Sequence, residues 1–171
     1  MTVSIYSVLV PTVNRVCANM LVVLKKGEAF AAAKKIDMSV LLNSRLAPDM
    51  LPLTRQVQIA TDGVKAGAAR LAGIEIPSFP DTETTLPELE ARIAKTLEFV
   101  NGVAPEKFAG SEDRVIHVPR RSGDLHINGL TYLLDFVLPN FYFHATTLYD
   151  ILRHNGVEVG KNDFLGKFDN A

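Results

Sequence analysis

The sequence predicts a mainly α protein, a four-helix bundle with a short β-hairpin between the third and fourth helices. Three observations predict this fold class. Four long segments repeat apolar residues at intervals of three and four. Two short runs, "RVIHV" and "DLHI", alternate instead, on either side of "PRRSG". With 171 residues, 47% of them hydrophobic, the chain is expected to form a single domain over residues 1–171.

The first helix is expected to run to about Lys35, with Pro11 in its first turn. Proline costs about 3 kcal/mol inside a helix, so the regular helix is predicted to begin there, and the residues before it need not be helical. The apolar face of this helix consists of Leu9, Val13, Val16, Met20 and Val23.

A short helical turn is predicted next, with Asp37 as its cap. The second long helix is expected to start near Asp49, whose carboxylate would cap the first turn. Gly63 and Gly67 lie beside its core stripe, where glycine costs about 1 kcal/mol relative to alanine. Either a neighbouring helix approaches closely there or the bundle keeps space; close approach is favoured. The stripe consists of Leu53, Val57, Ala60, Val64, Ala68 and Leu71.

Thr85 and Glu88 form a capping box that opens the third helix. The hairpin follows, and then a fourth helix from about Gly129 to Asn155. The first and third connections between the four helices are expected to be longer than the second. Pro139 is expected to bend this last helix because it removes one backbone donor. In the tail, three apolar residues are expected to pin the chain to the bundle: Phe164, Leu165 and Phe168.

Composition excludes several classes of function. Eighteen basic and 19 acidic residues give a net charge of -1, which disfavours nucleic-acid binding. Cys17, the one cysteine, lies at core spacing and is expected to be an inert core residue. The apolar N-terminus lacks a basic start and is interrupted by polar residues, so we expect neither export nor a membrane span. A cytoplasmic protein is the consequence.

The candidate site is polar and spans two helices. Asn140 and His144 are four residues apart and share one side of the fourth helix, and Gln56 is the polar residue of the second helix expected to point inward. Arg55, Gln58 and Asp62 are expected to be solvated. These residues form either a small-molecule pocket or a core histidine that is satisfied by Asn140 or a backbone carbonyl. No phosphate loop, HExxH, CxxC or GxSxG motif is present.

Four stretches carry a family resemblance: "SIYSVLVPTVNRV", "RLAPDMLPLTRQVQIATD", "LPNFYFHATTLYDILRHNGV" and "GKNDFLG". Together they resemble a bacterial family known only as a domain of unknown function, distantly similar to the DinB superfamily of four-helix bundles. DinB-like proteins often hold a divalent metal with three histidines, one on the second helix and two on the last, and some relatives are thiol-dependent transferases.

The resemblance implies that Gln56, Asn140 and His144 occupy the three metal-ligand positions. Only one of them is histidine, so we expect a degenerate site without metal or other cofactor, unless the hairpin histidines His117 and His126 or Asp62 complete it. The expected function is small-molecule binding in this pocket. The alternatives are a metal- or thiol-dependent enzyme acting through His144 and a structural or partner-binding module. A homodimer is also expected, from the resemblance and from the many aromatic residues of the fourth helix.

Overall fold

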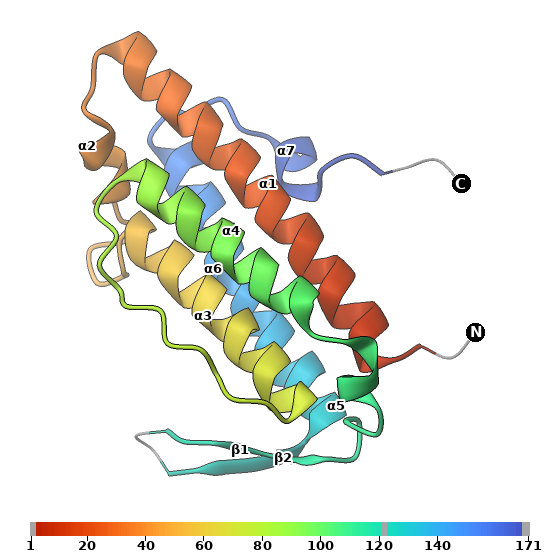
Figure 1. The fold of residues 1–171 in the computed structure, drawn as a ribbon. Coiled ribbons are helices and arrows are strands. Elements are labelled where there is room, and N and C mark those ends of the chain that lie inside the picture. The colour runs from red at the N-terminus through yellow and green to blue at the C-terminus, as the bar shows by residue number, and fades with distance from the viewer. Residues whose placement is uncertain (1–2, 121–122, 169–171) are drawn as a thin grey trace.

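The computed structural model describes residues 3–120 and 123–168, and long helices dominate it (Figure 1). Helix α1 packs against α4 and α6, and α3 packs against the same two helices, so the four close into a ring. The predicted four-helix bundle is therefore confirmed. The bounds of these helices are α1 (Ile5–Lys34), α3 (Leu53–Ala72), α4 (Leu86–Gly102) and α6 (Leu138–His154).

The directions of the helices explain one long connection. Figure 1 shows α1 and α6 running one way and α3 and α4 running the other. Because α3 and α4 are parallel, residues 73–85 must return along the length of the bundle before α4 can begin. This crossover lies outside α3 and α4 (Figure 1). The second connection therefore spans the length of the bundle, whereas the sequence predicted long connections only in the first and third positions.

The expected start of the first helix is wrong, because α1 begins at Ile5 and Pro11 lies inside it. A reciprocal capping box holds the new start: the backbone N–H of Ser7 donates to the Ser4 hydroxyl at 3.2 Å, and the N–H of Ser4 donates to the Ser7 hydroxyl at 2.9 Å. Ile5 and Leu9 are buried in the bundle. Capping and burial together offset the cost of the exposed proline.

The short helix α2 (Met38–Leu42) confirms Asp37 as its cap, since the carboxylate accepts the backbone N–H of Ser39 at 2.8 Å. Asp49 has no such role, because α3 begins at Leu53. Its N-cap residue is Pro52, which makes no side-chain capping bond. The backbone is still extended at Pro52, with ψ 165°, so the first turn of α3 lies later than the acidic residue suggests.

The predicted third helix and hairpin are both confirmed. The side chains of Thr85 and Glu88 form the capping box of α4. After the 3-10 turn η1 (Pro105–Phe108), strands β1 (Val115–Val118) and β2 (Leu125–Asn128) pair antiparallel, with His117 opposite His126. The hairpin lies across one end of the bundle (Figure 1).

The last long helical segment is continuous but not uniform. It starts with α5 (Gly129–Thr131), continues as the π-helical turn η2 (Tyr132–Val137), and becomes α6 directly before Pro139. In the π-helical turn the N–H of Leu138 donates to the carbonyl of Leu133, five residues earlier. The irregularity expected at Pro139 is therefore a widened turn.

The tail is pinned to the bundle, as the sequence predicts. The short helix α7 (Lys161–Leu165) packs on α1. The Phe164 ring meets Tyr149 edge to face at 5.9 Å, and the guanidinium of Arg15 lies 4.7 Å from the centre of the Phe168 ring. An ion pair between Lys26 and Asp163 at 2.8 Å adds a polar anchor.

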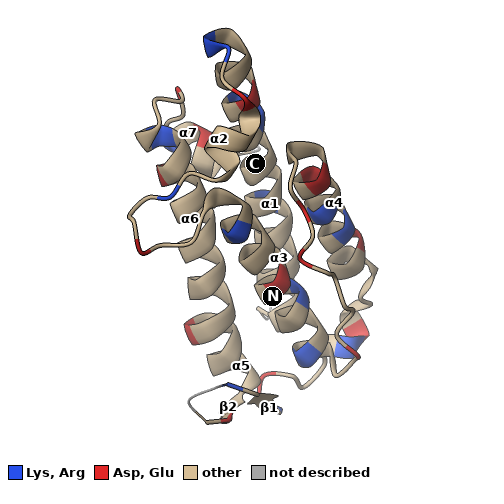
Figure 2. Cartoon of the chain, turned by 90° about the vertical axis from the view of Figure 1, so that its left-hand side faces the viewer, with Lys and Arg blue, Asp and Glu red and all other residues tan. Residues whose placement is uncertain are grey.

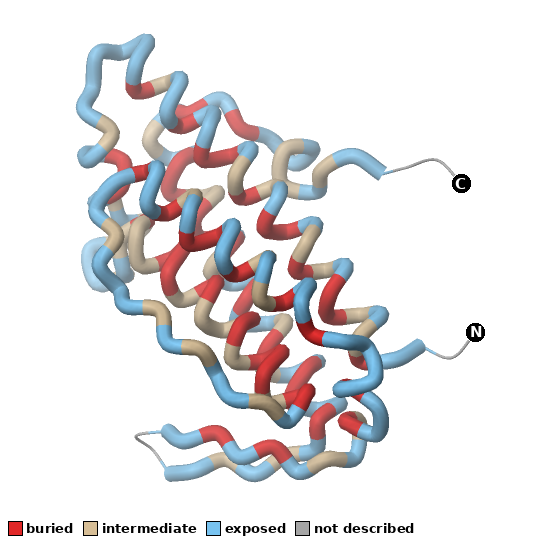
Figure 3. Tube along the Cα trace, in the orientation of Figure 1, coloured by how far each residue is buried: buried red, intermediate tan, exposed pale blue. Residues whose placement is uncertain are grey.

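Buried residues from all the long helices form one hydrophobic core, seen as inward-facing red segments in Figure 3. Cys17 lies fully inside this core, where burial raises the pKa of its thiol to about 12. A thiol with that pKa is protonated at neutral pH and is a poor nucleophile. The expected position of Cys17 in the core is confirmed.

One described helix is long and apolar enough to cross a membrane: α1, with a mean hydropathy of 1.6 in its most apolar window. The core helix of a soluble protein passes the same test, and α1 supplies buried residues along its whole length. The test is therefore weak evidence, and the absence of a membrane span stays a prediction.

The two glycines of α3 differ in their surroundings. A Cβ at Gly67 would lie 2.7 Å from a methyl carbon of Val137, which is the close helix approach that the sequence favours. A Cβ at Gly63 would meet nothing within 4 Å. Only one of the two glycines is therefore needed for packing.

We expect Gly63→Ala to raise the free energy of unfolding by up to about 1 kcal/mol, because alanine is the better helix former. Gly67→Ala gains the same propensity but must displace Val137, and we expect it to lower stability by about 1 kcal/mol. Urea unfolding of both variants checks this difference. Equal effects of the two substitutions would contradict the close packing of α3 against the π-helical turn.

Candidate functional site

Two of the three predicted site residues meet in the seam between α3 and α6. His144, on α6, places Nδ1 2.7 Å from Oε1 of Gln56 on α3. Gln56 is only 2% exposed, and its Nε2 donates to the carbonyl of Leu51 at 2.9 Å. The Phe143 ring meets the half-buried imidazole edge to face at 5.2 Å. The seam thus fixes both the position and the orientation of the imidazole.

This geometry determines which imidazole nitrogen carries the proton. A backbone carbonyl can only accept, so the Gln56 atom that faces Leu51 must be the amide nitrogen, and the atom that faces His144 must be the oxygen. Nδ1 of His144 therefore donates. Desolvation by burial holds the pKa of His144 below its ordinary value, so the ring is neutral at pH 7. A neutral ring protonated at Nδ1 has its lone pair on Nε2.

Asn140 does not join this pair. Its side chain is exposed, and its Nδ2 donates to the carbonyl of Phe136 on its own helix at 2.6 Å. Within the residues that the structure describes, its side chain makes no hydrogen bond to Gln56 or to His144. The amide satisfies backbone in the turn around Pro139, a role that the four-residue spacing does not reveal.

The residues considered as additional ligands lie elsewhere. Asp62 forms ion pairs at 2.8 Å with Lys65 and with Arg92. His117 and His126 stack across the exposed hairpin with ring centres 4.8 Å apart, at the opposite end of α3 from Gln56 (Figure 1). Over residues 3–120 and 123–168, no three histidine, cysteine, aspartate or glutamate side chains are arranged to hold a metal ion.

A second polar cluster was missed by the sequence analysis. The side chain of Arg92, on α4, is only 1% exposed. Its Nε donates to the hydroxyl of Thr61 at 2.9 Å, and its Nη1 donates to Glu83 at 2.9 Å. Its Nη2 lies 2.8 Å from Asp62 and 3.0 Å from Asp81, at ion-pair distance but without hydrogen-bond geometry. We call these five residues the Arg92 cluster.

The Arg92 cluster fastens the crossover to the bundle. Asp81 and Glu83 belong to residues 73–85, and Figure 2 shows charged residues on α3, α4 and the segment beside them. Gln58 was expected to be solvated, and that expectation is wrong: it is 2% exposed, accepts from Arg55 at 2.7 Å and donates to Glu83 at 2.8 Å. These contacts connect the crossover to α3 and α4.

The bundle, its crossover and its hairpin define a DinB-like helical protein. The crystal structure of a DinB family member protein from Shewanella denitrificans is similar, with a TM-score of 0.92 and 46% sequence identity over 97% of this chain and 94% of that chain. The family described as "Domain of unknown function (DUF1993)" matches residues 5–165. The chain belongs to this family, which is related to DinB, as the sequence resemblance predicts. A search of curated proteins gave no match.

Proposed function

We propose that this DinB-like protein binds a small neutral aromatic molecule with a hydrogen-bond donor at His144. The observation that carries the proposal is the 2.7 Å contact between His144 Nδ1 and Gln56 Oε1, because it leaves the Nε2 lone pair as an acceptor. None of the described residues donates to Nε2. The neighbouring Phe143, 55% exposed, offers an aromatic surface beside it.

A hydrogen-bond donor on the ligand would satisfy Nε2 of the half-buried imidazole, and an aromatic ring on the ligand would pack against Phe143. Charge is disfavoured because no charged residue occurs from Leu138 to Tyr149, so the part of α6 around His144 offers an ionic ligand no partner. The requirement for a donor distinguishes this site from simple hydrophobic contact.

The test uses phenol as probe and anisole, which lacks the hydroxyl donor, as its control. We expect phenol to shift the Nε2 resonance of His144 in the full-length protein with a Kd of about 1 mM. Anisole should bind at least about tenfold more weakly. Gln56→Leu should remove the preference because it frees Nδ1 and allows the other tautomer. Equal binding of phenol and anisole, or no shift with either, would overturn the proposal.

We propose further that this site is a degenerate form of the metal site found in DinB proteins. The residues do not fit a zinc or nickel centre. Nδ1 of His144 is occupied by Gln56, both atoms of the Gln56 amide are engaged, and Asn140 turns to its own backbone. One imidazole nitrogen remains, whereas a tight site needs about three good ligands.

We expect protein purified without a histidine tag to contain far less than one equivalent of zinc or nickel. The hairpin pair His117 and His126 is a second place where metal can collect, so a His117→Ala, His126→Ala variant serves as control. Elemental analysis of both proteins and of His144→Ala makes the measurement. Near-stoichiometric metal that survives the hairpin substitutions and disappears in His144→Ala would contradict the degenerate site and support the metalloenzyme alternative.

The same tautomer favours a second function, general-base catalysis. A neutral imidazole with its lone pair on Nε2 and an oriented Nδ1–H can take a proton from a bound substrate. Gln56 would then be a positioning residue. Small-molecule binding remains the first choice because, among the described residues, the only hydrogen bond of the imidazole is the one to Gln56, which is neither a nucleophile nor an acid or base.

We also propose a homodimer formed by the exposed apolar side of the last helical segment. Leu130 and Leu134, four residues apart on this segment, are 48% and 47% exposed, and Figure 2 shows little charge on α6. A second copy would remove these apolar side chains from water.

For the wild-type protein at micromolar concentration, we expect light scattering to give twice the chain mass of 18.7 kDa. Leu134→Glu should weaken the dimer at least about tenfold because it buries a charge in the interface. Val22→Glu places the same charge at an equally exposed apolar position on α1 and should leave the dimer intact. A monomeric wild-type protein, or an unchanged mass for Leu134→Glu, would contradict this interface.

A further inference from the structure

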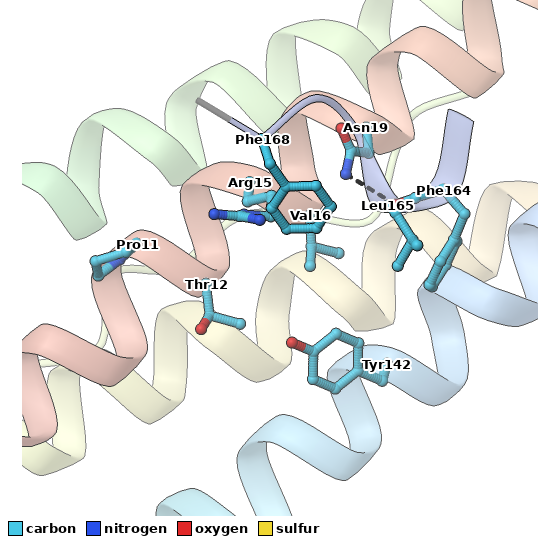
Figure 4. A pocket seen from close by; sticks show the side chains of 9 residues that line it. All are labelled: Pro11, Thr12, Arg15, Val16, Asn19, Tyr142, Phe164, Leu165 and Phe168. Carbon is cyan, nitrogen blue, oxygen red and sulfur yellow. Dashed lines mark hydrogen bonds between the residues drawn. The ribbon is translucent and has the colours of Figure 1, made fainter. Parts of the chain in front are cut away.

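A hollow of about 320 Å³ lies between α1, α6 and the tail, and no function above uses it (Figure 4). Its size is at the lower end of small-molecule sites, which are about 300–1,000 Å³. Tyr142 and His144 are two residues apart, so they leave α6 in nearly opposite directions. The hollow is therefore separate from the α3–α6 seam.

Arg15 lies in one wall of the hollow, and no acidic side chain among the described residues pairs with it. Arg15 reaches from α1, and its guanidinium stacks 4.7 Å from the centre of the Phe168 ring. Stacking uses the face of the guanidinium and leaves its in-plane N–H groups free. Within residues 3–120 and 123–168, no carboxylate lies at ion-pair distance from Arg15, and no oxygen accepts a hydrogen bond from it. These in-plane donors suit a planar carboxylate.

Two hydroxyl groups line the same hollow as the guanidinium. In Figure 4, Arg15, Thr12 and the Tyr142 hydroxyl lie at the end of the hollow away from Phe164 and Leu165. Neither hydroxyl makes a hydrogen bond to any residue that the structure describes. Each hydroxyl can donate a hydrogen bond to a ligand in the hollow. Three polar groups with unused donors therefore gather at one end.

The other end of the hollow is apolar and is held in place. Phe164 and Leu165 of the tail form it, with Val16 beneath them (Figure 4). Asn19 fixes this wall, because its Nδ2 donates to the carbonyl of Phe164 at 2.8 Å. A ligand with one anionic end and one apolar end matches this division. Arg15 is the only cation among the described lining residues, so a single negative charge is matched best.

We propose that the hollow binds a small aromatic monocarboxylate, with its carboxylate on Arg15, Thr12 and Tyr142 and its ring against Phe164 and Leu165. The carboxylate accepts from the guanidinium edge and from the two hydroxyls, a charge-assisted arrangement stronger than neutral hydrogen bonds. The ring removes apolar surface of the tail from water. The tail thus forms one wall of a binding site.

The probe is phenylacetate, and the control is phenylacetamide, which has a similar shape and no charge. In a nitrogen-15 titration of the full chain, we expect phenylacetate to shift the amides of Arg15, Asn19, Tyr142 and Leu165 with one saturating curve below about 10 mM. Phenylacetamide should bind at least about tenfold more weakly. His144→Ala should change neither result, which separates this site from the seam.

Arg15→Gln should abolish the preference for the carboxylate, and Tyr142→Phe should weaken phenylacetate several-fold without changing the fold. Arg153→Gln removes an exposed arginine elsewhere on α6 and should have no effect. A thermal melt confirms that each variant is folded. Equal affinity for the two probes, shifts that do not map to these residues, unchanged binding in Arg15→Gln, or no binding of phenylacetate would each overturn the proposal.

Discussion

Replacing Arg92 by methionine is expected to lower the free energy of unfolding by about 3 kcal/mol, because it leaves the carboxylates of the crossover and of α3 without their buried partner. Methionine keeps most of the apolar stem, so the loss reports the guanidinium. For a chain of this length the melting temperature should fall by about 10 °C. Urea and thermal unfolding measure both quantities.

Lowering the pH should reduce the difference in stability between wild type and Arg92→Met. Desolvation alone would raise the pKa of Asp81 and Glu83, but Arg55 and Arg92 beside Asp81, and Gln58 and Arg92 beside Glu83, hold both pKa values below their ordinary range. A carboxyl with a lower pKa in the folded state adds stability above its ordinary pKa, and this is lost as the pH falls through the folded value. Wild type and Arg92→Met should therefore converge as the pH falls below the ordinary carboxyl pKa of about 4.

The matched control is Lys95→Met, an exposed cation one turn further along α4, 4.2 Å from the centre of the Phe79 ring. Its loss should cost less than about 1 kcal/mol. If Arg92→Met lowers the free energy of unfolding at pH 7 by no more than Lys95→Met does, the Arg92 cluster does not hold the crossover. An unchanged gap between wild type and Arg92→Met at acid pH would show that the carboxylates are not its partners.

Gly129→Ala is expected to be the other strongly destabilising substitution, by about 3 kcal/mol or enough to prevent folding. A Cβ at Gly129 would lie 1.8 Å from the carbonyl oxygen of Ser111 and 2.9 Å from its carbonyl carbon. Ser111 is fully buried, and its backbone cannot move as a flexible side chain would. The strand-to-helix junction would have to separate from the loop beneath it.

Gly102→Ala is the control for Gly129→Ala, because a Cβ at the end of α4 meets nothing within 4 Å. Its stability should stay within about 0.5 kcal/mol of wild type. Denaturant unfolding compares the two variants. A Gly129→Ala protein with wild-type stability would contradict the close contact between Ser111 and the start of α5.

Local signals in the sequence predict much of the bundle. The Thr85–Glu88 capping box and the alternating hairpin runs work through neighbours in the chain, so they can be recognised without the fold. Asp49 and Pro11 gave wrong helix starts because their effect depends on the fold and not on neighbours in the chain. An acidic residue caps only when the chain turns there, and a proline is accepted inside α1 because burial of that helix in the core outweighs its cost.

The candidate site could be predicted only where helix periodicity places a side chain on an inward face. Gln56 and His144 both lie on faces that turn toward the seam, so their common location follows from spacing. Their hydrogen bond does not, because Asn140 or a backbone carbonyl was the expected partner of His144. Arg92 follows Leu89 by three residues and also faces inward, a signal that was available. Its acidic partners on residues 73–85 could not be foreseen, because the path of a crossover without regular structure leaves no periodic pattern.

The π-helical turn η2 acts as a one-residue insertion in the last helical segment. Each residue of a helix turns the chain by about 100°, so one residue more or less rotates everything that follows by that angle. With a regular α-turn in place of Tyr132–Val137, the hairpin could stay where it is while His144 left the seam and Gln56. The length of this turn therefore decides which side chains α6 presents to α3. Family members with the same histidine but one residue fewer here would hold it on a different face.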